Sequence, residues 1–98
     1  MTQIHRTIKV NGRVQGVGFR AGASHKAKSL GLLGFVENNE DGSVHIEVEG
    51  EKEQVEQFTG WCHEGTMLSR VDSVLIQAKS LQHYVDFSIR KTDINLLE

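Results

Sequence analysis

The sequence contains no proline and a single cysteine, which limits both its turns and its redox chemistry. Without proline, each sharp turn has to be made by Gly, Asn, Asp or Ser. Because Cys62 has no second cysteine to pair with, no internal disulfide can form, and this fits a reducing cytosol. No apolar run approaches the roughly 20 residues that span a bilayer, and residues 1–10 lack the apolar segment of a signal peptide. We therefore expect a cytoplasmic protein with no membrane contact.

An excess of basic charge is also missing. The 98 residues carry a net charge of −2, and Lys and Arg do not gather in clusters. A nucleic-acid interface needs a basic face, and an RNA-recognition module needs exposed aromatic residues on its strands. The chain has only one Trp, one Tyr and four Phe, and its third predicted strand exposes His and Glu. We expect no nucleic-acid partner.

Metal and nucleotide motifs are missing as well. The histidines are too widely spaced for a zinc motif and have no cysteine pair beside them: His5, His25, His45, His63 and His83. Cys62 and His63 are neighbours on a predicted helix, where adjacent side chains do not face each other, so they do not form a nucleophile and its base. The glycines match neither the G-x-G-x-x-G spacing nor a Walker A motif. The sequence therefore contains no recognisable zinc-binding or nucleotide-binding motif.

Apolar periodicity and turn residues predict the order strand, helix, strand, strand, helix, strand, with room for one further strand at the end. The predicted elements are a strand over 5–14, a helix over 21–30, a hairpin over 34–50 that turns at Asp41-Gly42, a helix over 51–65, and strands over 70–79 and 84–91. This order is the ferredoxin-like α+β sandwich (βαββαβ), an antiparallel sheet with two helices on one face. We expect residues 1–91 to form one domain and residues 92–98 a mobile tail.

The same patterns predict which side chains face the core. The candidates are Ile8, Val10 and Val14, then Ala23, Ala27 and Leu30, then Val44, Ile46 and Val48, then Val55, Phe58 and Cys62, and finally Val85, Phe87 and Ile89. Gly31 follows the first helix, where a left-handed cap residue is expected.

The stretch VQGVGFR, residues 14–20, is the first candidate for chemistry. Two glycines one residue apart allow positive φ angles and a close approach of the backbone to a ligand. Successive N–H groups can then form a concave anion site, and Arg20 adds a planar set of donors that suits phosphate or carboxylate oxygens. The alternative is an ordinary strand-to-helix turn that ends in a solvated arginine.

Asn38 is the second candidate, because it lies shortly before the Asp41-Gly42 turn and on the strand after the first helix. In a ferredoxin-like sheet this strand pairs with the central third strand, which makes nearness to the glycine loop plausible. The alternative is an asparagine that only serves the strand end. The neighbouring acids Glu37, Glu40 and Asp41 are interpreted as turn chemistry rather than as a general base.

Two stretches together, GRVQGVGFR (12–20) and LGLLGFVENNEDGSV (30–44), resemble the two signatures of acylphosphatases, and the likeness extends to FSIR near the end. The resemblance implies the ferredoxin-like fold and hydrolysis of the mixed anhydride between a carboxylate and phosphate, without metal or organic cofactor. It implies that the Arg20 guanidinium binds the phosphoryl group and that Asn38 orients the attacking water. It also implies that the backbone around the phosphoryl group is supplied by Gln15, Gly16, Val17, Gly18 and Phe19.

Several positions depart from the family pattern. A bulky residue often follows the arginine, whereas Ala21 and Gly22 are small here. The usual Gly-Pro after the second helix reads Gly65-Thr66, and Lys91 leads into seven further residues where many members end on Tyr. None of these positions is Arg20 or Asn38, so we expect effects on rate and stability rather than loss of the reaction.

The resemblance leaves a second functional class open. Related domains occur inside larger proteins, so the chain could be a non-catalytic phosphate-binding module with a regulatory or maturation role. Because the sequence contains no linker, we expect the enzyme, acting as a monomer on a small-molecule acyl phosphate.

Overall fold

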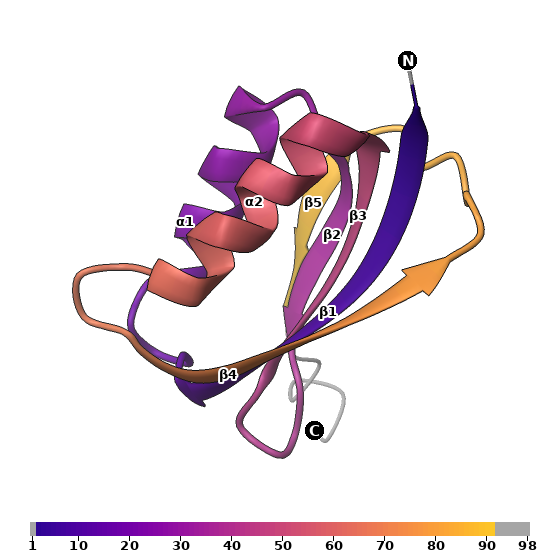
Figure 1. Ribbon diagram of the computed structural model, residues 1–98. Helices are drawn as coiled ribbons and strands as arrows, with labels where there is room; N and C mark the ends of the chain where they lie inside the picture. Colours follow the sequence, from indigo (N-terminus) through magenta and orange to yellow (C-terminus); the bar gives the residue numbers. More distant parts are fainter. Residues whose placement is uncertain (1, 92–98) are drawn as a thin grey trace, which may run out of the picture.

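The computed structural model describes residues 2–91, and Figure 1 shows two helices packed on one face of a twisted sheet. Five strands and two helices follow one another along the chain: β1 (Gln3–Arg13), α1 (Phe19–Ser29), β2 (Leu33–Asn38), β3 (Val44–Glu51), α2 (Lys52–Glu64), β4 (Arg70–Lys79) and β5 (Phe87–Arg90). The predicted tail, 92–98, lies outside the described residues. No helix among the described residues is long and apolar enough to cross a membrane.

The strand order across the sheet is β4-β1-β3-β2-β5, with β3 in the centre between β1 and β2. The pairs β1·β3, β1·β4 and β2·β3 are antiparallel, as predicted. The further strand, β5, is also present, but it pairs in parallel with β2, so the complete sheet is mixed. The ferredoxin-like α+β fold predicted from the element order is confirmed.

The core lies between the helices and the sheet, and most predicted core residues are buried there. Ile8, Val10, Val14, Ala23, Ala27, Val44, Ile46, Val48, Val55, Phe58, Cys62 and Phe87 are all buried. Burial raises the pKa of the Cys62 thiol, so the neutral form persists and the residue serves packing rather than nucleophilic chemistry. The predicted cap and turn are also found, with φ values of 71° at Gly31 and 94° at Gly42.

The last strand differs from the prediction. Val85 lies outside β5 and is 90% exposed, and Ile89 is exposed by 40%, so only Phe87 of the predicted trio enters the core. The reason is a backbone anchor just before the strand. The buried Glu49 carboxylate accepts hydrogen bonds from the N–H groups of Gln82, His83 and Tyr84, which holds this segment in an irregular path until Phe87.

Candidate functional site

A cavity of about 210 Å³ opens where β1, α1, β2 and β5 come together. It is lined by Val14, Gly16, Gly18, Phe19, Arg20, Ala21, Asn38 and Ile89. The fold therefore brings the glycine loop, Arg20 and Asn38 to one place, although Asn38 is separated from Arg20 by a helix and a strand. Five of the seven predicted site residues line this cavity.

The loop between β1 and α1 has the conformation that its glycines allow. Gly16 and Gly18 adopt φ angles of 74° and 79°, in the left-handed region that side chains disfavour. An added Cβ at either position would meet no atom within 4 Å, so this side of the loop is open. Left-handed residues that alternate with right-handed ones turn successive N–H groups toward the same side, as in an anion-binding nest.

The backbone donors of this loop are unsatisfied. Within residues 2–91, no backbone or side-chain acceptor bonds the N–H groups of residues 15 to 21, and the start of α1 has no side-chain cap. Its first turn also contains no acidic residue. Since unpaired N–H groups and the positive end of the helix dipole both attract anions, this helix start is suited to a phosphate or a carboxylate.

Arg20 belongs to the first turn of α1, because the helix begins at Phe19 rather than after Arg20 as the sequence suggested. Its Nη1 donates a hydrogen bond of 3.0 Å to the backbone carbonyl of Arg90, at the end of β5. This bond uses one of the five guanidinium donors. Among the described residues, Arg20 forms no ion pair with a carboxylate, so its positive charge is left for a ligand.

Asn38 is the last residue of β2, paired with Val44 of β3 across the hairpin. Its Oδ1 is buried, and in the described part of the chain it is the one buried side-chain N or O atom without a hydrogen-bond partner. A buried carbonyl without a partner is costly, and native structures usually satisfy it with a protein group or an ordered water. Asn38 also lines the cavity, so its carboxamide belongs to the candidate site.

Gln15 and Val17 do not line the cavity, and their polar groups hold the loop from outside. The Gln15 side chain donates to the carbonyl oxygens of Asn39 and Ser43, at 2.8 and 2.9 Å. The Val17 carbonyl accepts a hydrogen bond of 3.0 Å from the Thr66 hydroxyl. For these two residues, only the backbone N–H groups remain as candidate ligand donors.

The acid nearest the hairpin turn behaves as the sequence suggested. Asp41 accepts hydrogen bonds from the hydroxyl and the N–H of Ser43 and lies 2.9 Å from Lys9 Nζ. These hydrogen bonds from Ser43, followed by Lys9, hold the pKa of the Asp41 carboxyl well below its usual range. Asp41 is thus a permanently charged turn residue and does not line the cavity.

Sequence reasoning missed Ile89, which lines the cavity from β5, and the Arg90 carbonyl, which accepts the hydrogen bond from Arg20. The parallel pairing of β5 with β2 places Ile89 opposite Val36 and Arg90 opposite Glu37, next to Asn38. The FSIR likeness marked this segment, but nothing local in it indicates a contact with Arg20.

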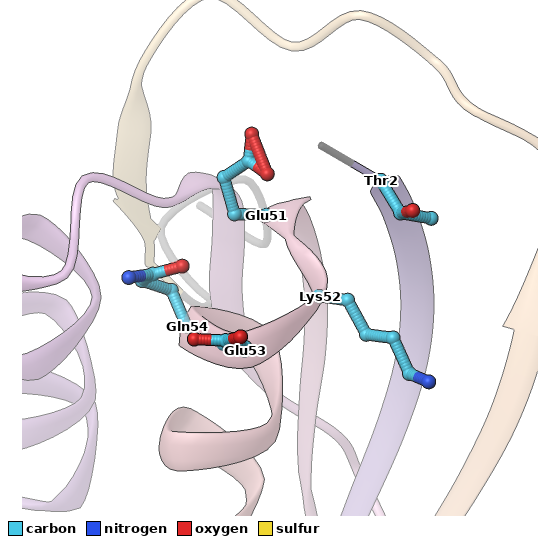
Figure 2. A pocket seen from close by; sticks show the side chains of 5 residues that line it. All are labelled: Thr2, Glu51, Lys52, Glu53 and Gln54. Atoms are coloured by element: carbon cyan, nitrogen blue, oxygen red, sulfur yellow. The ribbon is translucent and has the colours of Figure 1, made fainter.

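A larger hollow, of about 480 Å³, lies at the start of α2, away from the glycine loop. Figure 2 shows its side chains, with Lys52 pointing away from Glu51 and Glu53. The carboxylates of Glu51 and Glu53 surround the helix start, where they oppose an anion rather than attract one. This hollow therefore lacks the convergent donors of the smaller cavity.

The chain is similar to known proteins over most of its length. Residues 6–89 match the family model described as Acylphosphatase. An acylphosphatase of Aliivibrio fischeri is 42% identical over 89 residues, which cover 91% of this chain and 99% of that protein. The crystal structure of acylphosphatase from Bacillus subtilis is similar with a TM-score of 0.87 at 35% identity, covering 89% of this chain and 98% of that one. Full-length HypF in its phosphate- and nucleotide-bound form is similar with a TM-score of 0.86 at 35% identity, covering 95% of this chain and 13% of that one.

Proposed function

The chain belongs to the acylphosphatase family and is an acylphosphate phosphohydrolase, and from this premise we propose how its own residues carry out the reaction. Water attacks the phosphorus of an acyl phosphate, a new O–P bond forms, and the bond between phosphorus and the acyl oxygen breaks. The electron pair leaves with the carboxylate, and inorganic phosphate is the second product. A carboxylate is a good leaving group, so little proton assistance is needed on that side.

The glycine loop and Arg20 bind the phosphoryl group. The unpaired N–H groups of residues 15 to 21 and the uncompensated guanidinium line or border one cavity. Phosphoryl transfer proceeds through a loose transition state whose charge lies on the equatorial oxygens. Donors that are already oriented toward these oxygens stabilise that charge without further reorganisation.

Asn38 orients the attacking water through its side-chain carboxamide. A neutral amide can hold the water without repelling the incoming dianion. A carboxylate at this position would add about 1 to 4 kcal/mol of repulsion per charge pair at 4 Å, for effective dielectric constants of 80 to 20. The proton of the water passes to a phosphate oxygen of the substrate, since none of the residues 2–91 that line the cavity carries a carboxylate.

The observation that carries this mechanism is the meeting of three groups at one cavity: the backbone N–H groups of the glycine loop, the Arg20 guanidinium and the Asn38 carboxamide. Within residues 2–91 these N–H groups have no acceptor, Arg20 has no carboxylate beside it, and Asn38 Oδ1 has no hydrogen-bond partner. A second candidate function is a phosphate-binding module without catalysis. It is favoured by the match to one segment of the much longer HypF chain. The two functions share phosphate binding and differ in turnover.

The deciding experiment is hydrolysis of benzoyl phosphate by the purified chain in the presence of EDTA. We expect turnover well above the rate in buffer, with and without the chelator. Phosphate binding without any turnover would contradict the enzyme mechanism and support the module. The Arg20→Ala variant, prepared in the same way, reports any contaminating phosphatase.

A further inference from the structure

The turn after α2 lies at the same end of the molecule as the glycine loop (Figure 1), and a hydrogen bond joins the two. Thr66 Oγ1 donates a 3.0 Å hydrogen bond to the carbonyl oxygen of Val17, a residue 49 positions earlier. Val17 lies between the two left-handed glycines, so this bond reaches the middle of the predicted phosphate cradle.

Thr66 is itself held rigidly. Its N–H donates to Ser69 Oγ at 2.8 Å, while the Ser69 hydroxyl and N–H both bond to the Thr66 carbonyl, at 2.9 and 3.1 Å. This small ring of hydrogen bonds replaces the stiffness that the proline of the family pattern would provide. A proline at this position would have no hydroxyl to donate to Val17.

Gly22 completes the same packing unit. A Cβ at Gly22 would lie 2.9 Å from the Thr66 methyl group and 3.0 Å from the Trp61 ring, closer than side chains normally approach. The small residue on α1 therefore leaves room for Thr66. Gly22 and Thr66, which both depart from the family pattern, therefore pack against each other.

The geometry of the peptide unit links Thr66 to the ligand side of the loop. The chain contains no cis peptide bond among its described residues, so the Val17 C=O and the Gly18 N–H point in opposite directions across one plane. When Thr66 holds the carbonyl on the outside, the Gly18 N–H is turned the other way. Gly18 lines the cavity, and its N–H has no acceptor within residues 2–91.

We propose that Thr66 is a positioning residue that sets the direction of the Gly18 N–H toward the phosphoryl group. This inference rests on the proposed function of the loop. The restraint matters because Gly18 can rotate through φ values closed to other residues, so the 17–18 peptide could otherwise flip. Losing one neutral hydrogen bond should weaken the oriented state by about 3- to 10-fold.

The test compares Thr66→Val, which keeps the shape and removes the hydroxyl, with Thr66→Ser, which keeps the hydroxyl. Inorganic phosphate is titrated into each ¹⁵N-labelled protein while the Gly18 amide signal is followed. We expect Thr66→Val to bind phosphate about 3- to 10-fold more weakly, with a smaller Gly18 shift at saturation, and Thr66→Ser to resemble the wild type. Thr59→Val is the matched control, because it removes a hydroxyl bond to Glu56 on α2, away from the loop.

Wild-type phosphate affinity and an unchanged Gly18 shift in Thr66→Val would overturn the inference, and so would an equal loss in Thr66→Ser. If Thr66→Val does not fold, Thr66→Ser and Thr66→Ala give the same comparison, because they differ only in the hydroxyl. Benzoyl phosphate hydrolysis by the wild type is measured in parallel. If the wild type hydrolyses benzoyl phosphate but Thr66→Val binds phosphate normally, only the role of Thr66 is refuted. If the wild type shows no hydrolysis, the proposed function is refuted.

Discussion

Gln15 Nε2 donates hydrogen bonds to the carbonyl oxygens of Asn39 and Ser43 on the two sides of the β2–β3 turn. The side chain therefore links the glycine loop to the β2–β3 turn, which begins directly after Asn38. This link fixes the glycine loop relative to Asn38. The loop is proposed to hold the phosphoryl group, and Asn38 is proposed to hold the water. The Gln15 side chain performs this task without lining the cavity.

Replacing Gln15 with Ala should loosen the link between the glycine loop and Asn38. The carbonyls of Asn39 and Ser43 keep their turn hydrogen bonds, so we expect a stability loss of about 1 to 2 kcal/mol for the two missing bonds. A small misalignment should lower kcat about 10-fold or more while phosphate affinity changes less. Chemical denaturation and steady-state assays with benzoyl phosphate measure both effects. Gln57→Ala, on the exposed face of α2, is the control, and a purely KM effect would contradict the prediction.

Removing the Arg20 guanidinium should abolish both binding and turnover. We expect Arg20→Ala to lose phosphate affinity and to reduce turnover by at least 10²- to 10³-fold, as is typical when a donor to the transition-state charge is removed. Arg13→Ala deletes the same charge from an exposed position at the end of β1 and controls for the change in net charge. Calorimetric titration of inorganic phosphate into both variants decides the matter, and unchanged affinity in Arg20→Ala would disprove the assigned role.

Replacing Asn38 should affect turnover and leave phosphate binding in place. Asn38→Ala removes the carboxamide that is proposed to orient the water, so kcat should collapse while the inhibition constant of inorganic phosphate stays near the wild-type value. Asn38→Asp should impair both, because its charge repels the dianion. Asn11→Ala, which loses a surface hydrogen bond to Ser73, is the control. Normal kcat with a raised KM in Asn38→Ala would show that Asn38 binds substrate instead.

The parts of the fold that could be predicted are those whose burial follows their own repeat. Val44, Ile46 and Val48 alternate with polar residues, and Val55, Phe58 and Cys62 recur with the helical period. Each repeat by itself indicates which side chains are buried, and all six are buried in the structure. The start of β5 could not be predicted in this way. It depends on the Glu49 carboxylate, which holds a segment more than 30 residues later in the chain.

The candidate site shows the same division. Gly16, Gly18 and Arg20 lie within five residues of one another in the sequence. The order of helices and strands brings Asn38 to the same end of the sheet. The bond from Thr66 to Val17 depends instead on how closely α1 approaches the turn after α2, which only the packed structure defines. Contacts between distant loops have no periodic pattern, so sequence reading identifies Thr66 as unusual without indicating its partner.

A chain of charged and polar groups also connects β1, β2 and β3. Glu47 lies at its centre, bonded at 2.6 Å to His5 Nε2, at 2.5 Å to His45 Nε2 and at 2.7 Å to the Thr7 hydroxyl. His45 continues the chain to Glu37 at 2.7 Å. Burial alone would raise the pKa of Glu47, but the bonds from Thr7, His45 and His5 outweigh it and hold the pKa below its ordinary value of 4.5.

This lowered pKa predicts that the free energy of unfolding decreases at acidic pH, a decrease that we call the acid limb of the stability curve. A carboxyl whose pKa is lower in the folded state stabilises the fold above its unfolded pKa, and the contribution disappears as the pH falls from about 4.5 through the folded value. Glu47→Gln cannot titrate, so it should be less stable than the wild type at pH 7, by about 1 to 2 kcal/mol, and the difference should shrink below pH 4.5. Urea unfolding from pH 3 to 7 measures this difference. Glu53→Gln, which changes an exposed carboxyl on α2, should leave the acid limb intact, and an equally steep limb in Glu47→Gln would show that other carboxyls cause it.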